Sequence, residues 1–235
     1  AYINTTWTLF VSSQNTEHIY IYEYDGNTWN KNSFEINDQP YGGRDLDVRY
    51  IQNNWYLFIG NDSGGQVFIL KRNAGGEWNL IKTIDHSEVG ATTAFAKVSV
   101  YENQGAWQIV VADVGENIYI MDLLHRGLTY ESLGGNGDLS TVIQTIPEPM
   151  GLSPTSYGGG EVYLSPDKKQ LYVGDFTNSR VYIYEGDGIH WRLLSQILEQ
   201  NDTLFGKSIV MSPDYTKLYG INDSNFYTYT SNDRI

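Results

Sequence analysis

A five-residue pattern of alternating β-branched, aliphatic and aromatic residues recurs five times in this chain of 235 residues. The copies are Ile19–Glu23, Val67–Lys71, Ile118–Asp122, Val181–Glu185 and Phe226–Thr230. Counted from residues 19, 67, 118, 181 and 226, their first residues lie 48, 51, 63 and 45 positions apart. Short β-rich segments at such a period predict an array of similar sheets, because one sheet alone cannot bury both of its faces.

Each copy lies among other segments that also read as strands. An apolar run precedes it, such as Trp55–Ile59, and an aromatic–small pair such as Tyr41-Gly42 opens a further strand upstream. After the first four copies come a glycine-containing turn and an aromatic residue, as in Asp25–Trp29. Asp and Gly tolerate the backbone angles of hairpin turns. The order of these features predicts an all-β fold, a five-bladed β-propeller of four-stranded antiparallel blades.

The repeats predict a single domain made of consecutive blades. Their approximate bounds are 1–40, 41–94, 95–156, 157–204 and 205–235. We expect the ring to close near the termini, which would remove exposed sheet edges. Ala1–Asn4 would then be either a short inner strand of the first blade or a strand added to the last blade, and the sequence does not decide between these. The proline- and glycine-containing segment 133–156 is expected to be a long irregular loop.

Composition excludes several classes of partner. The net charge of −13 argues against nucleic acid, because a phosphate polymer would be repelled. No apolar stretch is long enough for a membrane helix, so membrane insertion is not expected. The chain has no cysteine and few lysines and arginines, but 19 tyrosines. We interpret this composition as typical of an extracellular or virion-surface protein.

Two segments resemble known propeller repeats. Leu164–Asp167, followed by Leu171–Gly174 and Val181–Tyr184, resembles YVTN repeats, and Phe205–Asp214 resembles the opening of an FG-GAP repeat of integrin α-subunit heads. The resemblance implies a propeller fold, and FG-GAP blades often hold calcium in an Asp-x-Asp-x-Asp-Gly loop. That spacing is missing here, so we expect neither a metal nor a cofactor.

Antiparallel blades place one set of connections on each face of the ring. The face on which the inner strands begin carries the more irregular segments, and we expect it to bind a ligand. The candidate ligand-binding residues on it are Tyr41, Arg44, Phe95, Tyr157, Glu161, Asp62, Asp113, Asp175 and Asp223. The aromatic residues would stack on a ligand, and Arg44 and Glu161 would contact a polar group. The four aspartates would either accept hydrogen bonds from a ligand or cap their own turns.

These features favour a non-catalytic surface propeller that binds or adheres to a glycan or a protein partner. Metalloprotease histidine spacing and the Gly-x-Ser-x-Gly elbow of esterases are missing. One alternative is a glycosidase-like hydrolase, in which Asp45, Asp47 and Glu161 supply axial carboxylates. The other alternative is a structural subunit of a larger virion or extracellular assembly, with the 133–156 loop as its contact.

Overall fold

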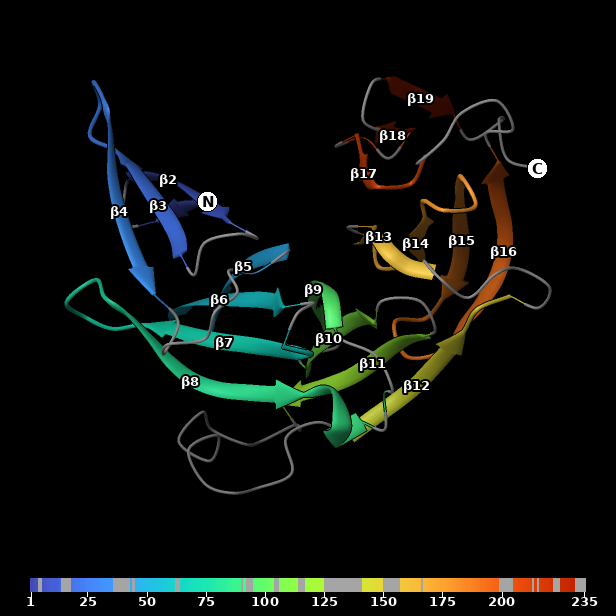
Figure 1. The fold of residues 1–235 in the computed structure, drawn as a ribbon, viewed down its shortest axis with the longest axis horizontal. Coiled ribbons are helices and arrows are strands. Elements are labelled where there is room, and N and C mark those ends of the chain that lie inside the picture. Colours follow the sequence, from blue (N-terminus) through green and yellow to red (C-terminus); the bar gives the residue numbers. More distant parts are fainter. Residues whose placement is uncertain are drawn as a thin grey trace.

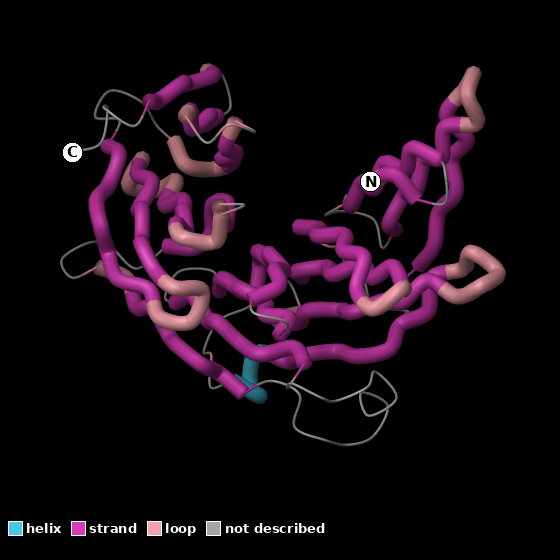
Figure 2. Tube along the Cα trace, turned by 180° about the vertical axis from the view of Figure 1, so that it is seen from behind, coloured by secondary structure: helices cyan, strands magenta, loops and turns pink. Residues whose placement is uncertain are grey.

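The computed structural model is an incompletely closed ring of five antiparallel sheets that follow one another in chain order, with the first and last sheets apart (Figure 1). It describes residues 1–3, 6–13, 18–35, 43, 45–61, 64–89, 91, 95–103, 106–113, 117–124, 141–149, 157–165, 167–198, 205–212, 214, 216–221 and 225–230. The prediction of a five-bladed β-propeller is confirmed. Seen from behind, the described chain is almost entirely strand, with one short helix, η1 (His86–Val89) (Figure 2).

Each sheet is a meander in which successive strands pair with one another. The first sheet contains β1 (Tyr2–Ile3), β2 (Thr6–Ser12), β3 (His18–Tyr24) and β4 (Trp29–Glu35). The second contains β5 (Asp45–Ile51), β6 (Asn54–Asn61), β7 (Gln66–Arg72) and β8 (Trp78–Asp85). The third contains β9 (Phe95–Asn103), β10 (Ala106–Asp113), β11 (Asn117–Leu124) and β12 (Thr141–Pro147). The fourth contains β13 (Tyr157–Leu164), β14 (Gln170–Asp175), β15 (Arg180–Gly186) and β16 (Trp191–Leu198), and the last contains β17 (Ser208–Met211), β18 (Lys217–Ile221) and β19 (Phe226–Thr230).

The hydrophobic core lies between neighbouring blades, because side chains alternate between the two faces of a strand. In the repeated segment, the first and third residues face the following blade and the second and fourth face the preceding one. Ile19 and Ile21 of the first blade therefore share one buried cluster with Phe68 and Leu70 of the second. The same arrangement recurs between later blades, which explains why the pattern repeats in the sequence.

The ends of the chain resolve the alternatives for residues 1–4. Tyr2 pairs with Trp7 and Ile3 with Thr6, so β1 is the short inner strand of the first blade. The last sheet has three strands among the described residues, and no sheet in this part of the chain combines strands from both ends. In the described residues, the blades therefore follow the order of the sequence.

The expectation of an irregular loop over 133–156 is wrong for its central part. Residues 141–147 form β12, the outer strand of the third blade, which pairs with β11. Its β-branched residues decide this, since Ile146 is buried and Ile143 packs partly against the same interblade cluster. The prolines at 147, 149 and 154 and the glycines before residue 141 obscured the strand in the sequence. Residues 133–140 and 150–156 lie outside the described part of the chain.

None of the helices in the described residues is long and apolar enough to span a membrane.

Candidate functional site in the hub

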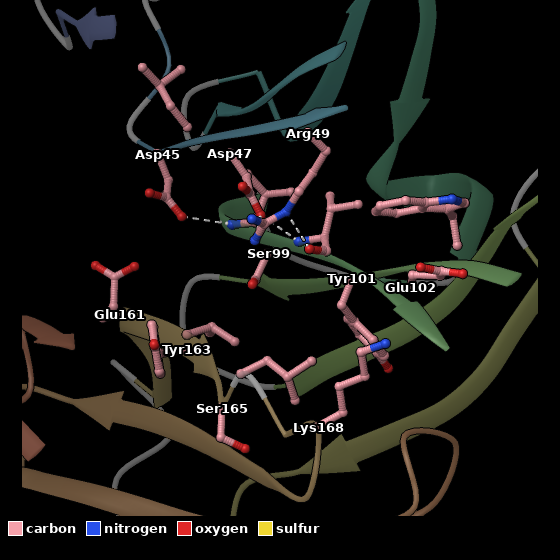
Figure 3. Close-up of a pocket in the computed structure, with 16 residues that line it drawn as sticks. Asp45, Asp47, Arg49, Ser99, Tyr101, Glu102, Glu161, Tyr163, Ser165 and Lys168 are labelled. Atoms are coloured by element: carbon pink, nitrogen blue, oxygen red, sulfur yellow. Dashed lines mark hydrogen bonds and ion pairs between the residues drawn. The ribbon is translucent and has the colours of Figure 1, made fainter. Parts of the chain in front are cut away.

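The innermost strands β5, β9 and β13 line a pocket of about 530 Å³ at the centre of the ring (Figure 3). It extends along these strands from Asp45 and Glu161 at one end to Glu102 and Lys168 at the other. Lys168 lies in the turn between β13 and β14. The pocket therefore reaches the face opposite the one that the sequence indicated for binding.

Two aspartates on β5 bind the backbone of the next blade. Asp45 accepts a hydrogen bond from the Val98 N–H (2.9 Å), and Asp47 accepts one from the Val100 N–H (2.6 Å). Arg49 donates to the Asp47 carboxylate (2.9 Å) and to the Val100 carbonyl (2.6 Å). These contacts join the second blade to the third and hold both carboxylates at the pocket wall.

Glu161 enters the hub from the fourth blade. Figure 3 shows its carboxylate facing that of Asp45 across the pocket. The ammonium nitrogen Nζ of Lys97, on β9, lies 3.5 Å from Oε2 of Glu161, and both side chains are largely buried. The hub therefore brings two carboxylates and one ammonium group together from three different blades.

Close backbone contact fixes the position of Glu161. The Glu161 N–H donates to the Gly206 carbonyl of the last blade at 3.2 Å. A Cβ atom added to Gly160 would lie 2.1 Å from this carbonyl oxygen, and one added to Gly174 would lie 1.9 Å from it. Only glycine therefore permits the fourth and last blades to approach this closely at the hub.

Burial changes the proton affinity of all three carboxylates. It raises the pKa of Glu161 to about 7, an effect that the charge of Asp45 reinforces and Lys97 opposes. It raises the pKa of Asp47 to about 6 against the attraction of Arg49, and it raises the pKa of Asp45 against Lys97. A carboxyl group with a pKa near 7 can take up and release a proton at neutral pH, which general acid–base catalysis requires.

Two of the predicted aspartates lie in buried turns between the second and third strands of their blades. Asp113 accepts a hydrogen bond from the Asn117 N–H (2.7 Å), and Asp175 accepts one from the Asn178 N–H (3.2 Å). Both are fully buried. Both aspartates therefore cap their own turns, which is the second of the two roles that the sequence allowed. Asp62 and Asp223 lie outside the described residues.

Sequence reasoning missed the second blade's member of this set. The buried Asn61 accepts a hydrogen bond from the Gly64 N–H at 3.2 Å. Asn61 is the last residue of β6 as Asp113 is the last residue of β10, so the recurring feature is a side-chain oxygen rather than a charge. Aligning the strands by their buried residues, instead of searching for aspartate, would have found it.

The predicted aromatic ligand-binding residues lie in different environments. Phe95 is fully buried and packs edge-to-face on Tyr119, with ring centroids 5.9 Å apart. The expectation that Phe95 opens toward a ligand is therefore wrong. Tyr157 begins β13 and pairs with Asp175. Tyr41 and Arg44 lie outside the described residues.

Arg49 and Lys168 line the pocket and were not singled out in the sequence. A signal existed for Arg49, because Asp45, Asp47 and Arg49 alternate along one strand and so share a face. Lys168 has a positive φ of 61° in the β13–β14 turn, which the sequence did not indicate. In the described part of the chain, no group of three or more His, Cys, Asp or Glu side chains is arranged to hold a metal ion.

Comparison with known proteins identifies the fold and no family. No protein-family model and no curated protein matches the sequence, so the resemblance to YVTN and FG-GAP repeats extends to the propeller architecture alone. Solved structures do match. A Bacteroides fragilis protein provisionally described as a 6-phosphogluconolactonase is 13% identical, with a TM-score of 0.65 over 96% of this chain and 65% of its own.

Two further structures are similar. The periplasmic gluconolactonase PpgL of Pseudomonas aeruginosa is 16% identical, with a TM-score of 0.68 over 95% of this chain and 65% of its own. A protein from Lactobacillus plantarum is 15% identical, with a TM-score of 0.62 over 97% of this chain and 67% of its own. The chain thus spans about two thirds of the length of the propellers that it matches.

These comparisons correct the expectation of a non-catalytic binding or adhesion propeller. Two of the similar structures are named as lactonases, which are enzymes. The hub of this chain has buried carboxylates with raised pKa values, which a simple adhesion surface does not need.

Proposed function

We propose that this propeller is a hydrolase that opens the cyclic ester of a sugar-acid lactone in the hub pocket. The observation that carries the proposal is Glu161, a largely buried carboxyl group with a pKa of about 7 beside Lys97. The similar folds of two proteins named for lactone chemistry support the choice of substrate class.

The reaction follows from the charges around Glu161. The Glu161 carboxylate removes a proton from a water molecule while the oxygen of that water attacks the carbonyl carbon of the lactone. The carbonyl oxygen becomes negatively charged, and the largely buried Lys97 ammonium beside Glu161 stabilises this charge. The ring C–O bond then breaks, and Glu161 returns the proton to the leaving oxygen. One lactone and one water thereby give one open-chain hydroxy acid.

Asp45, Asp47 and Arg49 position the site. Asp45 and Asp47 each accept a backbone hydrogen bond from β9, the strand that carries Lys97. The negative charge of Asp45 also raises the pKa of Glu161. We assign these residues to holding the hub together and tuning Glu161, rather than to attack on the substrate.

A second candidate is cleavage of a glycosidic bond. The observation that favours it is the pair Asp45 and Glu161, which face each other across the pocket (Figure 3). Glycosidases need two carboxyl groups on opposite sides of the scissile bond. Here Glu161, with its raised pKa, would be the acid.

The proposed location is outside the cytoplasm. One of the similar propellers is named as periplasmic, and the tyrosine-rich, lysine-poor composition agrees with a secreted protein. Fractionation of the source cells tests this. Recovery in the cytoplasm would contradict it.

The test of the reaction is a pH-stat assay with δ-gluconolactone, 6-phosphogluconolactone and a panel of aryl glycosides. We expect accelerated acid release from a lactone above the spontaneous rate, and a loss of roughly 100-fold or more for Glu161→Gln. The matched control is Glu77→Gln, the same change at an exposed turn far from the hub, which should keep the full rate. Glycoside cleavage without lactone opening would favour the second candidate. No turnover of either class would reject the hydrolase.

A further inference from the structure

The first sheet presents an apolar face to solvent. On β2, Trp7, Leu9 and Val11 are 59%, 50% and 40% exposed. The strand register pairs Trp7 with Tyr24 and Leu9 with Tyr22, and directly paired residues share a face. The outward face of the first sheet is therefore aromatic and aliphatic, and we refer to the face carrying these five residues as the first-sheet face.

The last sheet also presents an apolar face. Val210 is 49% exposed and Phe226 is 65% exposed. Val210 pairs with Tyr219, and the Tyr219 ring stacks on Phe226 with centroids 5.4 Å apart. Its other face, with Ile209, packs against the fourth blade. We refer to Val210, Tyr219 and Phe226 as the last-sheet face.

Equivalent residues in the other blades are buried. Leu57 and Ile59 of β6 occupy the places of Leu9 and Val11, and both are fully buried against the first blade. Phe226 opens its copy of the repeated segment. The residues that open the other four copies are all fully buried: Ile19, Val67, Ile118 and Val181. The two end faces thus have the residue pattern of an interface between blades.

This pattern does not fit a solvated surface. A monomeric soluble protein rarely exposes a large contiguous apolar patch. The two faces also differ in sequence, so contact of one with the other in a second copy would be head-to-tail, which builds a larger ring or an open filament rather than a two-fold dimer.

We propose that each end face packs against a further blade-like sheet of the same polypeptide, which meets it with aliphatic side chains as blades 1 to 5 meet one another. The similar propellers support this occupant. The alignments cover 95–96% of this chain but only 65% of the length of each similar protein. The remaining third of such a chain has the length of roughly two repeats.

Hydroxyl-radical footprinting of the full gene product and of residues 1–235 expressed alone tests the proposal. Tyr50, which is 53% exposed on the second blade, is the internal reference. In residues 1–235 alone, Trp7 and Phe226 should be oxidised about as readily as their exposure predicts. In the full product both should be protected roughly 10-fold or more, while Tyr50 is unchanged.

Other results overturn the proposal. Equal oxidation in both proteins would show that nothing covers the faces, and a gene product that ends with these 235 residues would remove the occupant. Protection in residues 1–235 alone would indicate a second copy if it rises with protein concentration. It would indicate contact between the first and last sheets if it does not.

A pair of variants gives an independent measure in the full product. Phe226→Thr should lower its Tm by about 3 °C or more, since a buried aromatic side chain is lost. Leu193→Thr, at a residue that is 48% exposed on β16, should leave the Tm almost unchanged. Equal small effects of the two substitutions would contradict the proposal.

Discussion

The hub and the turns between the second and third strands use carboxylates in opposite ways. In the turns, Asn61, Asp113 and Asp175 occupy the same place in successive blades and each accepts a backbone hydrogen bond. At the beginning of the inner strands the residues differ from blade to blade and meet from different blades, as Lys97 and Glu161 do. The recurring residues of this propeller maintain its scaffold, whereas the proposed chemistry depends on residues that depart from the repeat.

The largest expected effect is on the rate of lactone turnover, which should depend on the hub and not on the turns. Glu161→Gln should reduce lactone turnover by about 100-fold or more, because the general base is lost, without lowering the free energy of unfolding at pH 7. Steady-state kinetics and urea denaturation on the same preparation measure both quantities. A loss of activity accompanied by an equal loss of folded protein would assign Glu161 to the scaffold.

The next largest effect is on the free energy of unfolding, which should depend on the turn aspartates. Asp113→Ala should lower the free energy of unfolding by about 2 kcal/mol, because the partly buried Asn117 N–H loses its acceptor. The kcat of the remaining folded protein should stay the same. Urea denaturation gives the first value and active-site-normalised kinetics the second. A stable but inactive variant would place Asp113 in the site instead.

The pH dependence of stability sharpens the comparison. The pKa of Glu161 rises from its ordinary 4.5 to about 7 on folding, so between these values the folded state binds more protons than the unfolded state. The contribution is therefore favourable below pH 4.5 and is lost as the pH rises to 7, on the order of 1 kcal/mol or more. The raised pKa of Asp47 acts in the same direction.

Urea denaturation at pH 5 and pH 8 measures this loss. Glu161→Gln should reduce the difference in unfolding free energy between the two pH values, since glutamine does not titrate. An unchanged difference would mean that Glu161 keeps an ordinary pKa in the folded protein.

The smallest effect is expected for Asp113→Asn. Asparagine retains a side-chain oxygen, and the second blade already uses Asn61 in this place. The free energy of unfolding should change by less than about 0.5 kcal/mol. A loss as large as that for Asp113→Ala would show that the negative charge itself is required.

The sequence predicted the blades well because their evidence is local. Alternation within Val67–Lys71 or Val181–Glu185 specifies a strand with two buried faces without reference to the rest of the chain. The strand β12 escaped prediction because prolines and glycines surround its β-branched residues. Phe95 was misplaced because an aromatic residue at a strand end can point into the core or outward, and neighbouring blades decide which.

The site was only partly predictable. Asp45, Asp47 and Glu161 were identified as axial carboxylates from their places at the start of inner strands. The contact of Glu161 with Lys97 joins residues 64 positions apart. The hydrogen bonds of Asp45 and Asp47 to β9 depend on how two sheets pack. Such register between blades is non-local, so the pocket and the pKa of Glu161 required the structure.

The pH–rate profile of lactone opening tests the central claim most directly. For the unmodified protein, kcat/KM for δ-gluconolactone should rise with a single ionisation near pH 7, the pKa that burial gives Glu161. Glu161→Gln should abolish this ionisation together with most of the rate. A profile with its ionisation near pH 4.5, or one that Glu161→Gln leaves unchanged, would contradict the account.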